Sequence, residues 1–168
     1  MGRVMTDVVD RATRSEMMAS IRGRNTGPEV ALRSALHCLG LRFRLHRVGL
    51  PGRPDVVLPR YRATVFVHGC FWHRHADCHL AYTPRTRVDF WRAKFAANVK
   101  RDARQRTALL EDGWRVATVW ECAIRARRAD AVAAELAAWL AGSGRELEIG
   151  TPSARASGHE QGIDRHEG

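Results

Sequence analysis

The sequence predicts an α/β domain in which a small mixed sheet is flanked by helices. Short apolar runs with the length of buried strands alternate with longer stretches whose apolar residues recur at the spacing of amphipathic helices. Clusters of Gly and Pro separate these stretches and mark their ends. The resulting order is α-α-β-β-β-α-β-α, which is typical of a layered α/β fold.

Two helices are expected to open the domain, after a polar lead-in over residues 1–10. Thr13-Arg14-Ser15-Glu16 has the pattern of a capping box at a helix start, and this first helix would end near Gly23. Thr26-Gly27-Pro28-Glu29 is a second capping box. The helix after it carries an apolar stripe and ends at Gly40; the stripe consists of Leu32, Leu36 and Leu39.

Strands and further helices follow in order. Residues 41–45 alternate apolar and basic side chains, as a half-buried strand does, and a Gly- and Pro-rich turn leads to Asp55. Buried strands are expected over residues 56–58, 63–67 and 114–120. Long helices are expected over residues 87–112, with Gly113 as the stop, and 129–140. From Gly142 the chain is polar, which predicts a folded domain over residues 11–141 and a disordered tail over 142–168.

Composition narrows the class of protein. The 168 residues suit one domain, and a net charge of +10 points to a polyanionic partner such as nucleic acid. An arginine-rich proteome would raise the charge without any binding role, so charge alone does not decide. No apolar run reaches the roughly eighteen residues that span a bilayer, and no signal peptide is evident. We therefore expect a cytoplasmic protein without membrane contact.

Cysteine and histidine are concentrated in one stretch, and they suggest a metal site. Cys70, His75 and Cys78, joined by Cys122 from a strand end, would form a closed Cys3His set of the kind that holds structural zinc. His73 and His79 are competing ligands. The alternative is that these are ordinary buried thiols, as we assume for Cys38 on the apolar side of the second helix.

A second group of residues suggests hydrolysis of a phosphodiester. Asp55 at a strand start would face the end of the next strand, where a carboxylate can hold Mg2+. His68 or His73 could then take a proton from the attacking water. The plainer alternative is that Pro54-Asp55 is only a turn and that each histidine is an ordinary polar residue. Glu29 likewise has a plain account in its capping box.

Paired aromatic residues accompany these groups. Phe71-Trp72 and Phe90-Trp91 could stack on bases or insert between them, although the usual place of such side chains is the core. Two adjacent large aromatics on a loop cannot easily both face inward, so we expect at least one of Phe71 and Trp72 to be exposed or to cover a site. Phosphate contacts, or merely solvated helix faces, would come from Arg14, Arg22, Arg24, Lys94, Lys100, Arg101 and Arg104.

Several unusual motifs together resemble one family, the very-short-patch repair (Vsr) endonucleases. The resemblance runs in order from about residue 10 to residue 140. It rests on Ala12-Thr13-Arg14-Ser15, Leu50-Pro51-Gly52-Arg53-Pro54-Asp55, Phe66-Val67-His68-Gly69-Cys70-Phe71-Trp72-His73, Asn98-Val99-Lys100-Arg101-Asp102 and Val119-Trp120-Glu121-Cys122.

The resemblance implies a restriction-endonuclease-like fold with a structural zinc ion. It also implies Mg2+-dependent nicking of duplex DNA immediately 5′ of the thymine in a T·G mismatch. Such mismatches arise when 5-methylcytosine deaminates, so the family is linked to a DNA cytosine methyltransferase. The resemblance leaves contact with mismatch-repair proteins open, and we expect a monomer that joins the nucleoid when it binds DNA.

Roles carried over from the family fall on residues already singled out. Asp55 and the backbone carbonyl of Val67 would bind Mg2+, His73 would be the general base, and His68 and Glu29 would order metal-bound water and phosphate. The zinc ligands match Cys70, His75, Cys78 and Cys122. The wedge beside the mismatch matches Phe71, Trp72 and Trp91, with Met18 inserting from the minor groove.

Two departures from the family pattern stand out. Position 67 is Val where Thr is common, but a backbone contact would survive this change. The segment from His75 to Cys78 is one residue longer than usual, which affects the loop geometry and the choice between His75 and His73 as ligand. Two other functions remain open: a non-catalytic, zinc-stabilised mismatch-binding module, and a general nicking endonuclease of the same fold.

Overall fold

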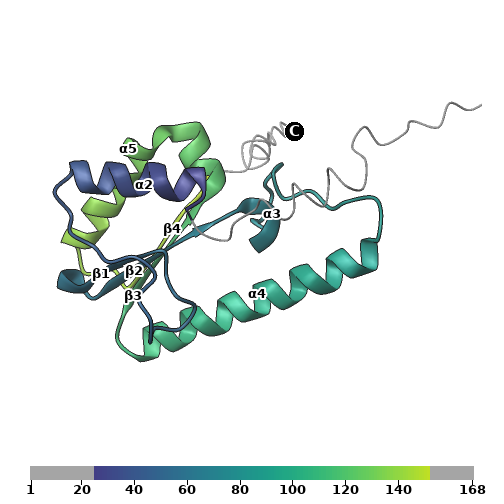
Figure 1. Cartoon of the computed structure of the whole chain (residues 1–168), viewed down its shortest axis with the longest axis horizontal. Helices are drawn as coiled ribbons and strands as arrows, with labels where there is room; N and C mark the ends of the chain where they lie inside the picture. Colours follow the sequence, from purple (N-terminus) through teal and green to yellow (C-terminus); the bar gives the residue numbers. More distant parts are fainter. Residues whose placement is uncertain (1–24, 152–168) are drawn as a thin grey trace, which may run out of the picture.

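The computed structural model describes residues 25–151 of the chain (Figure 1). The first expected helix lies outside these residues, as do Met18, Arg14, Arg22 and Arg24. The elements in order are α2 (Gly27–Cys38), β1 (Val56–Leu58), the 3-10 turn η1 (Pro59–Tyr61), β2 (Ala63–His68), α3 (Cys70–His73), α4 (Val88–Glu111), β3 (Arg115–Trp120), α5 (Glu121–Ala141) and β4 (Glu146–Ile149).

The strands form one mixed sheet in the order β1-β2-β3-β4. β1 runs antiparallel to β2, whereas β2 and β3, and then β3 and β4, are parallel. The helical connection through α4 explains the parallel pairing of β2 with β3, because parallel neighbours need a long crossover. The predicted small mixed sheet flanked by helices is confirmed.

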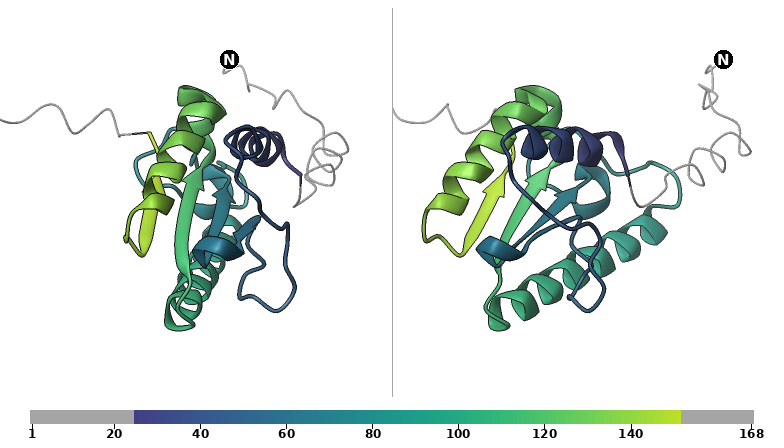
Figure 2. Two further views of the ribbon diagram at one scale, coloured as in Figure 1. Left: turned by 90° about the vertical axis from the view of Figure 1, so that its left-hand side faces the viewer. Right: turned by 60° about the vertical axis from the view of Figure 1, so that its left-hand side comes forward.

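Helices cover both faces of the sheet. α2 and α5 pack together over one face and α4 runs along the other (Figures 1 and 2). Successive strand residues point to opposite faces, so Val65 and Val119 enter the core with Leu32 and Leu136 from the two helices. The alternate residues of β2, among them His68, therefore face the side of α4.

The expected strand over residues 41–45 is wrong except for one pair. Only Arg44 pairs with Val57, through two backbone hydrogen bonds of 2.8 Å. β1 is three residues long, and positive φ angles at Gly40 and His46 turn the chain away on either side. Leu41 and Phe43 still pack on the core, as the alternation predicts, but Leu45 is 44% exposed, so the alternation holds for two of its three apolar residues.

The expected disorder from residue 142 is wrong for residues 142–151. Strand β4 lies there and pairs in parallel with β3, and Ile149 is 1% exposed. Leu147 and Ile149 alternate with glutamates, which is enough apolar surface for a short half-buried strand. Residues 152–168 lie outside the described part of the chain.

The later helices match their prediction with one difference. α4 agrees with the expected helix to within a residue at each end, but α5 begins at Glu121 rather than at residue 129. Arg128 has φ 63° and ψ 151° inside it, a non-helical conformation that kinks the helix. The kink divides α5 into two segments. The first contains the zinc-ligand candidate Cys122, and the second is the predicted apolar helix. Between residues 25 and 151, no helix is both long and apolar enough to cross a membrane.

Candidate active site and metal centre

An open cleft of about 800 Å³ lies where the end of β2 meets the start of β1. Asp55, Val67, His68 and His73 all line it. These are the catalytic candidates that the sequence placed at strand ends, and the fold brings them together. Glu29 reaches the same cleft from α2, and the cleft is also lined by Trp72, Asp102, Arg53, Arg101 and Arg125.

Asp55 is fixed by the antiparallel pairing of β1 with β2. Its Oδ2 accepts a hydrogen bond of 2.8 Å from the backbone N–H of Val67, so the carboxylate is fixed at the end of β2. Burial raises the pKa of Asp55 to about 6, although the Val67 N–H opposes the shift. A buried carboxylate with this raised pKa lacks a full countercharge, and a bound divalent cation would supply one. The oxygen donor also suits Mg2+.

His73 forms a tight pair with a residue that the sequence interpretation gave no role. Its Nδ1 lies 2.5 Å from Oδ2 of Asp102 on α4. Burial alone would raise the pKa of Asp102, but the hydrogen bond from His73, the charges of His73 and His68 and a hydrogen bond from Arg101 together lower the pKa below its usual value. The carboxylate therefore stays charged. It orients the imidazole and leaves Nε2 as the nitrogen that can take a proton.

Asp102 was noted only as part of the motif over residues 98–102 and was given no role, because it lies 29 positions from His73 in the sequence. One signal could have found it. Asn98 precedes it by one helical turn, so the two share a face of α4, and the side-chain amide of Asn98 donates to the backbone carbonyl of Trp72. One face of α4 thus makes two hydrogen bonds to α3: Asn98 binds the backbone of Trp72, and Asp102 binds the side chain of His73.

His68 lies parallel to His73. The two ring centroids are 3.9 Å apart and the ring planes differ by 8°. Burial, and next the charge of His73, lowers the pKa of His68 to about 3, so His68 is neutral at ordinary pH. Ligand atoms of His68, His73 and Asp102 lie within 4.8 Å of one another. Because imidazole lone pairs lie in the ring plane, two parallel rings cannot converge on one ion without rotating.

Glu29 is buried at the start of α2. Its carboxylate accepts hydrogen bonds from the Asn25 N–H, the Thr26 hydroxyl and Arg33. The capping box is therefore wrong in its detail, because the Thr26 side chain donates to Glu29 instead of accepting from the helix backbone. Glu29 also raises the pKa of Asp55 electrostatically, so two carboxyl groups act on the same end of the cleft.

The four predicted zinc ligands also come together. Ligand atoms of Cys70, His75, Cys78 and Cys122 all lie within 4.8 Å of one another. The Nδ1 atom of His75 is 3.3 Å from the Cys122 sulfur and 3.8 Å from the Cys70 sulfur. Three sulfurs and one nitrogen are the donors that zinc prefers, and they leave no open position. We call these four residues the Cys3His cluster.

Burial also fits a metal in the Cys3His cluster. Cys70 is fully buried and its burial raises the pKa of the thiol, a cost to the thiolate that a bound cation would offset. Neither competing histidine belongs to the cluster: His73 pairs with Asp102, and His79 lies on the exposed loop. The assumption that Cys38 is buried is wrong, since it is exposed at the end of α2.

The paired aromatics gather at the N-terminal end of α4. Phe71 contacts the rings of Trp72, Tyr82, Trp91 and Phe95 at centroid distances of 5.0–5.5 Å. Phe71, Trp72 and Trp91 are all half-buried, and Phe90 is 47% exposed. Trp72 also lines the cleft. The expectation that one of the adjacent pair covers a site is met by Trp72.

Basic side chains lie beside these aromatics. Lys94 is within 6.0 Å of the Trp72 and Phe90 ring centroids. Lys100, Arg101 and Arg104 follow on α4 and are exposed. Arg101 also pairs with Asp102 at 3.1 Å. The N-terminal end of α4 therefore presents flat apolar surface and the middle of the helix presents positive charge, the combination that nucleic acids favour.

Comparison with known proteins gives a consistent result. Residues 6–80 match the family model described as DNA mismatch endonuclease Vsr. The chain is 47% identical over 150 residues to the DNA mismatch endonuclease Vsr of Escherichia coli K12, covering 88% of this chain and 96% of that protein. It is 51% identical over 118 residues to the type II nicking enzyme V.XorIIP of Xanthomonas oryzae, covering 70% and 86% of the two chains. The type II nicking enzyme V.NmeAIP of Neisseria meningitidis is 39% identical over 121 residues, covering 72% and 86%.

Proposed function

This chain belongs to the Vsr family of DNA mismatch endonucleases, and from that premise we propose that it nicks one strand of duplex DNA immediately 5′ of the thymine in a T·G mismatch, with Mg2+ as cofactor. The observation that carries the proposal is the meeting of the Asp55 carboxylate with the His73–Asp102 pair in one open cleft. The lesions would come from deaminated 5-methylcytosine, which links the enzyme to a DNA cytosine methyltransferase.

The proposed chemistry assigns a separate task to each group. Asp55 and the Val67 carbonyl would hold Mg2+, which when bound neutralises charge on the scissile phosphate. His73 would take the proton of the attacking water at Nε2, and Asp102 would stabilise the imidazolium that results. His68, held neutral by burial, and Glu29 would order water and phosphate. The products would be a 3′-hydroxyl and a 5′-phosphate.

The Cys3His cluster is proposed to hold structural Zn2+. It would join the loop after α3 to the start of α5, two segments separated by 44 positions between Cys78 and Cys122. A restriction-endonuclease-like fold accords with this α/β arrangement and stays a prediction.

Mismatch recognition is proposed to depend on the aromatic end of α4. Phe71, Trp72 and Trp91 would form the wedge that unstacks the mismatched pair, with Lys94 and the basic residues of α4 on phosphates. Met18, which lies outside the described residues, would insert from the minor groove. In the free protein Phe71 packs against both Trp72 and Trp91, which supports insertion of these three rings as one unit.

The decisive experiment compares two end-labelled duplexes that differ at a single pair, T·G or C·G. Purified protein is incubated with each in Mg2+, and the products are resolved on a denaturing gel. We expect a nick 5′ of the thymine in the mismatched duplex alone. Equal cutting of both duplexes would instead indicate a general nicking endonuclease, and tight binding without cleavage would indicate a mismatch-binding module.

A further inference from the structure

Four aromatic rings connect the Cys3His cluster with the proposed catalytic base. His75, a cluster member, stacks on Trp120 with centroids 4.3 Å apart and planes differing by 15°. Trp120 meets His68 edge to face at 5.4 Å, and His68 stacks on His73 at 3.9 Å. We call these four residues the ring row. Through these ring contacts, Trp120 at the end of β3 links the Cys3His cluster to the catalytic candidate His73.

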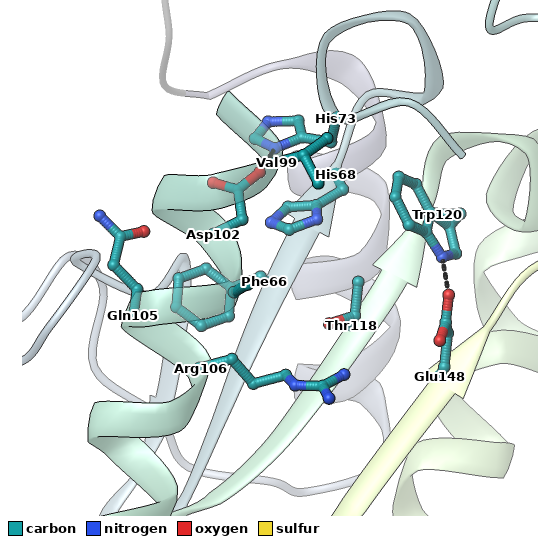
Figure 3. Close-up of a pocket in the computed structure, with 11 residues that line it drawn as sticks. Phe66, His68, His73, Val99, Asp102, Gln105, Arg106, Thr118, Trp120 and Glu148 are labelled. Carbon is teal, nitrogen blue, oxygen red and sulfur yellow. Dashed lines mark hydrogen bonds and ion pairs between the residues drawn. The ribbon is translucent and has the colours of Figure 1, made fainter. Parts of the chain in front are cut away.

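Trp120 is held firmly within the ring row. It lies at the end of β3 and is 8% exposed. Its indole N–H donates a hydrogen bond of 2.7 Å to Oε1 of Glu148 on β4 (Figure 3). The backbone after β4 also closes on the stack, because a Cβ atom at Gly150 would lie 2.7 Å from the His75 ring and 3.3 Å from Trp120.

His68 contacts both of its neighbours in the ring row. It lies between His73 and Trp120, and its described ring contacts are those two and Phe66 at 5.7 Å (Figure 3). A neutral side chain in a packed site takes its orientation from shape and hydrogen bonds rather than from an ion pair. A shift of Trp120 would therefore move His68, and through the stack it would move His73.

We propose that Trp120 is a positioning residue for the reaction, fixed by Glu148, and that it transmits the placement of the Cys3His cluster through His68 to the base His73. The inference rests on the proposed nicking function. It gives the cluster a second role beyond stabilising the fold, and it gives β4 a part in catalysis although no β4 residue touches the Asp55 end of the cleft.

The first test removes the anchor rather than the ring, because Glu148 is exposed and its loss leaves the core intact. Glu148→Ala should lower kcat for T·G nicking about 3- to 10-fold with little change in KM, the scale of one lost hydrogen bond. Glu148→Gln keeps an acceptor and should restore kcat. The matched control is Glu146→Ala, two residues earlier on β4, which removes the same charge but pairs with Arg106 instead.

A double-mutant cycle asks whether Glu148 acts through Trp120. Trp120→Phe keeps an aromatic ring in the row and removes the indole N–H. In that background Glu148→Ala should have no further effect on kcat, since coupled residues are not additive. Additive losses would overturn the inference, as would a fall in zinc content that parallels the fall in kcat. A wild-type kcat in Glu148→Ala would overturn it as well.

A final measurement does not depend on nicking. The Nδ1 proton between His73 and Asp102 should give a downfield NMR signal, since that bond is short. We expect the signal to shift or broaden in Glu148→Ala and to stay unchanged in Glu146→Ala. An unchanged signal in both overturns the positioning role even if wild-type protein nicks normally. If wild-type protein fails to nick, the proposed function fails, and this measurement still tests the inference.

Discussion

The two candidate metal sites of this molecule, the Cys3His cluster and the cleft at Asp55, differ in how accessible they are. The Cys3His cluster is closed: four soft donors converge, and two of its three cysteines are buried. The catalytic cleft is open, and its main carboxylate has a pKa raised by burial to about 6. The first arrangement is suited to stabilising the fold, because metal binding and folding are coupled there. The second is suited to binding a cation, because burial leaves the Asp55 carboxylate without a full countercharge.

Two residues of the same type that are close in sequence can belong to different sites. His73 and His75 lie two positions apart at the end of α3, yet one pairs with Asp102 and the other points its Nδ1 at two cysteine sulfurs. The left-handed residue Arg74, with φ 57°, reverses the chain between them. A single turn therefore assigns one histidine to each site.

The largest effect is expected when one ligand of the Cys3His cluster is removed. Cys122→Ser removes a ligand from the element that lies farthest away in the sequence, so zinc should be lost and the fold destabilised by several kcal/mol, roughly the loss seen on removing a structural metal ligand. Bound zinc and the thermal midpoint report the result. Cys38→Ser is the matched control, since Cys38 is exposed and outside the cluster. Equal zinc content in both variants would contradict the structural role.

The next largest effect is expected at the cleft, and it should spare the fold. Asp55→Ala removes the carboxylate proposed for Mg2+, so T·G nicking should fall by about a thousandfold or more while zinc content stays unchanged. Asp112→Ala, an exposed carboxylate at the end of α4, should nick normally. Activity retained in Asp55→Ala would remove Asp55 from the mechanism.

A smaller effect is expected from changing Asp102, the partner of the proposed base His73. Asp102→Asn keeps the shape of the side chain but removes the charge that would stabilise the His73 imidazolium, so kcat should fall roughly 100-fold with KM little changed. Zinc content should again be normal. Single-turnover rates with saturating mismatched duplex give the measurement, and a variant that keeps the wild-type rate would show that proton transfer does not limit the reaction.

Sequence reasoning predicted the sites better where the chemistry is carried by rare residue types. Cys, His and Trp in the stretch from His68 to Cys78 pointed to both sites, and the resemblance to the Vsr family drawn from those motifs is confirmed by 47% identity to a family member. Asp102 escaped because an aspartate on a basic helix is ordinary, and only the tertiary approach of α4 to α3 makes it a partner of His73.

The fold was least predictable at the edges of the sheet. Strand β4 is four residues long within polar sequence, and it forms because β3 offers an edge to Leu147 and Ile149. The run from Leu41 to Leu45 has a clearer alternation, yet β1 offers only three residues to pair with. In both segments, strand formation depends on how many residues the neighbouring strand offers for pairing. The local sequence pattern does not contain this information.

The smallest expected effect is a change in the free energy of unfolding when Asp55 is replaced. At Asp55 the charged side chain should destabilise the fold, whereas the Cys3His cluster is expected to stabilise it. Since burial raises the pKa of Asp55 from 3.8 to about 6, the folded state holds a proton that the unfolded state releases between these values. Stability contributed by protonated Asp55 is therefore lost as pH rises through 6. Asp55→Asn carries no charge, so without Mg2+ it should be more stable than wild type by about 3 kcal/mol near pH 8 and by less than about 1 kcal/mol near pH 4. Urea unfolding at both pH values measures the difference, and added Mg2+ should narrow it by binding the wild-type carboxylate. A variant less stable than wild type at the higher pH would mean that Asp55, like the Cys3His cluster, stabilises the fold.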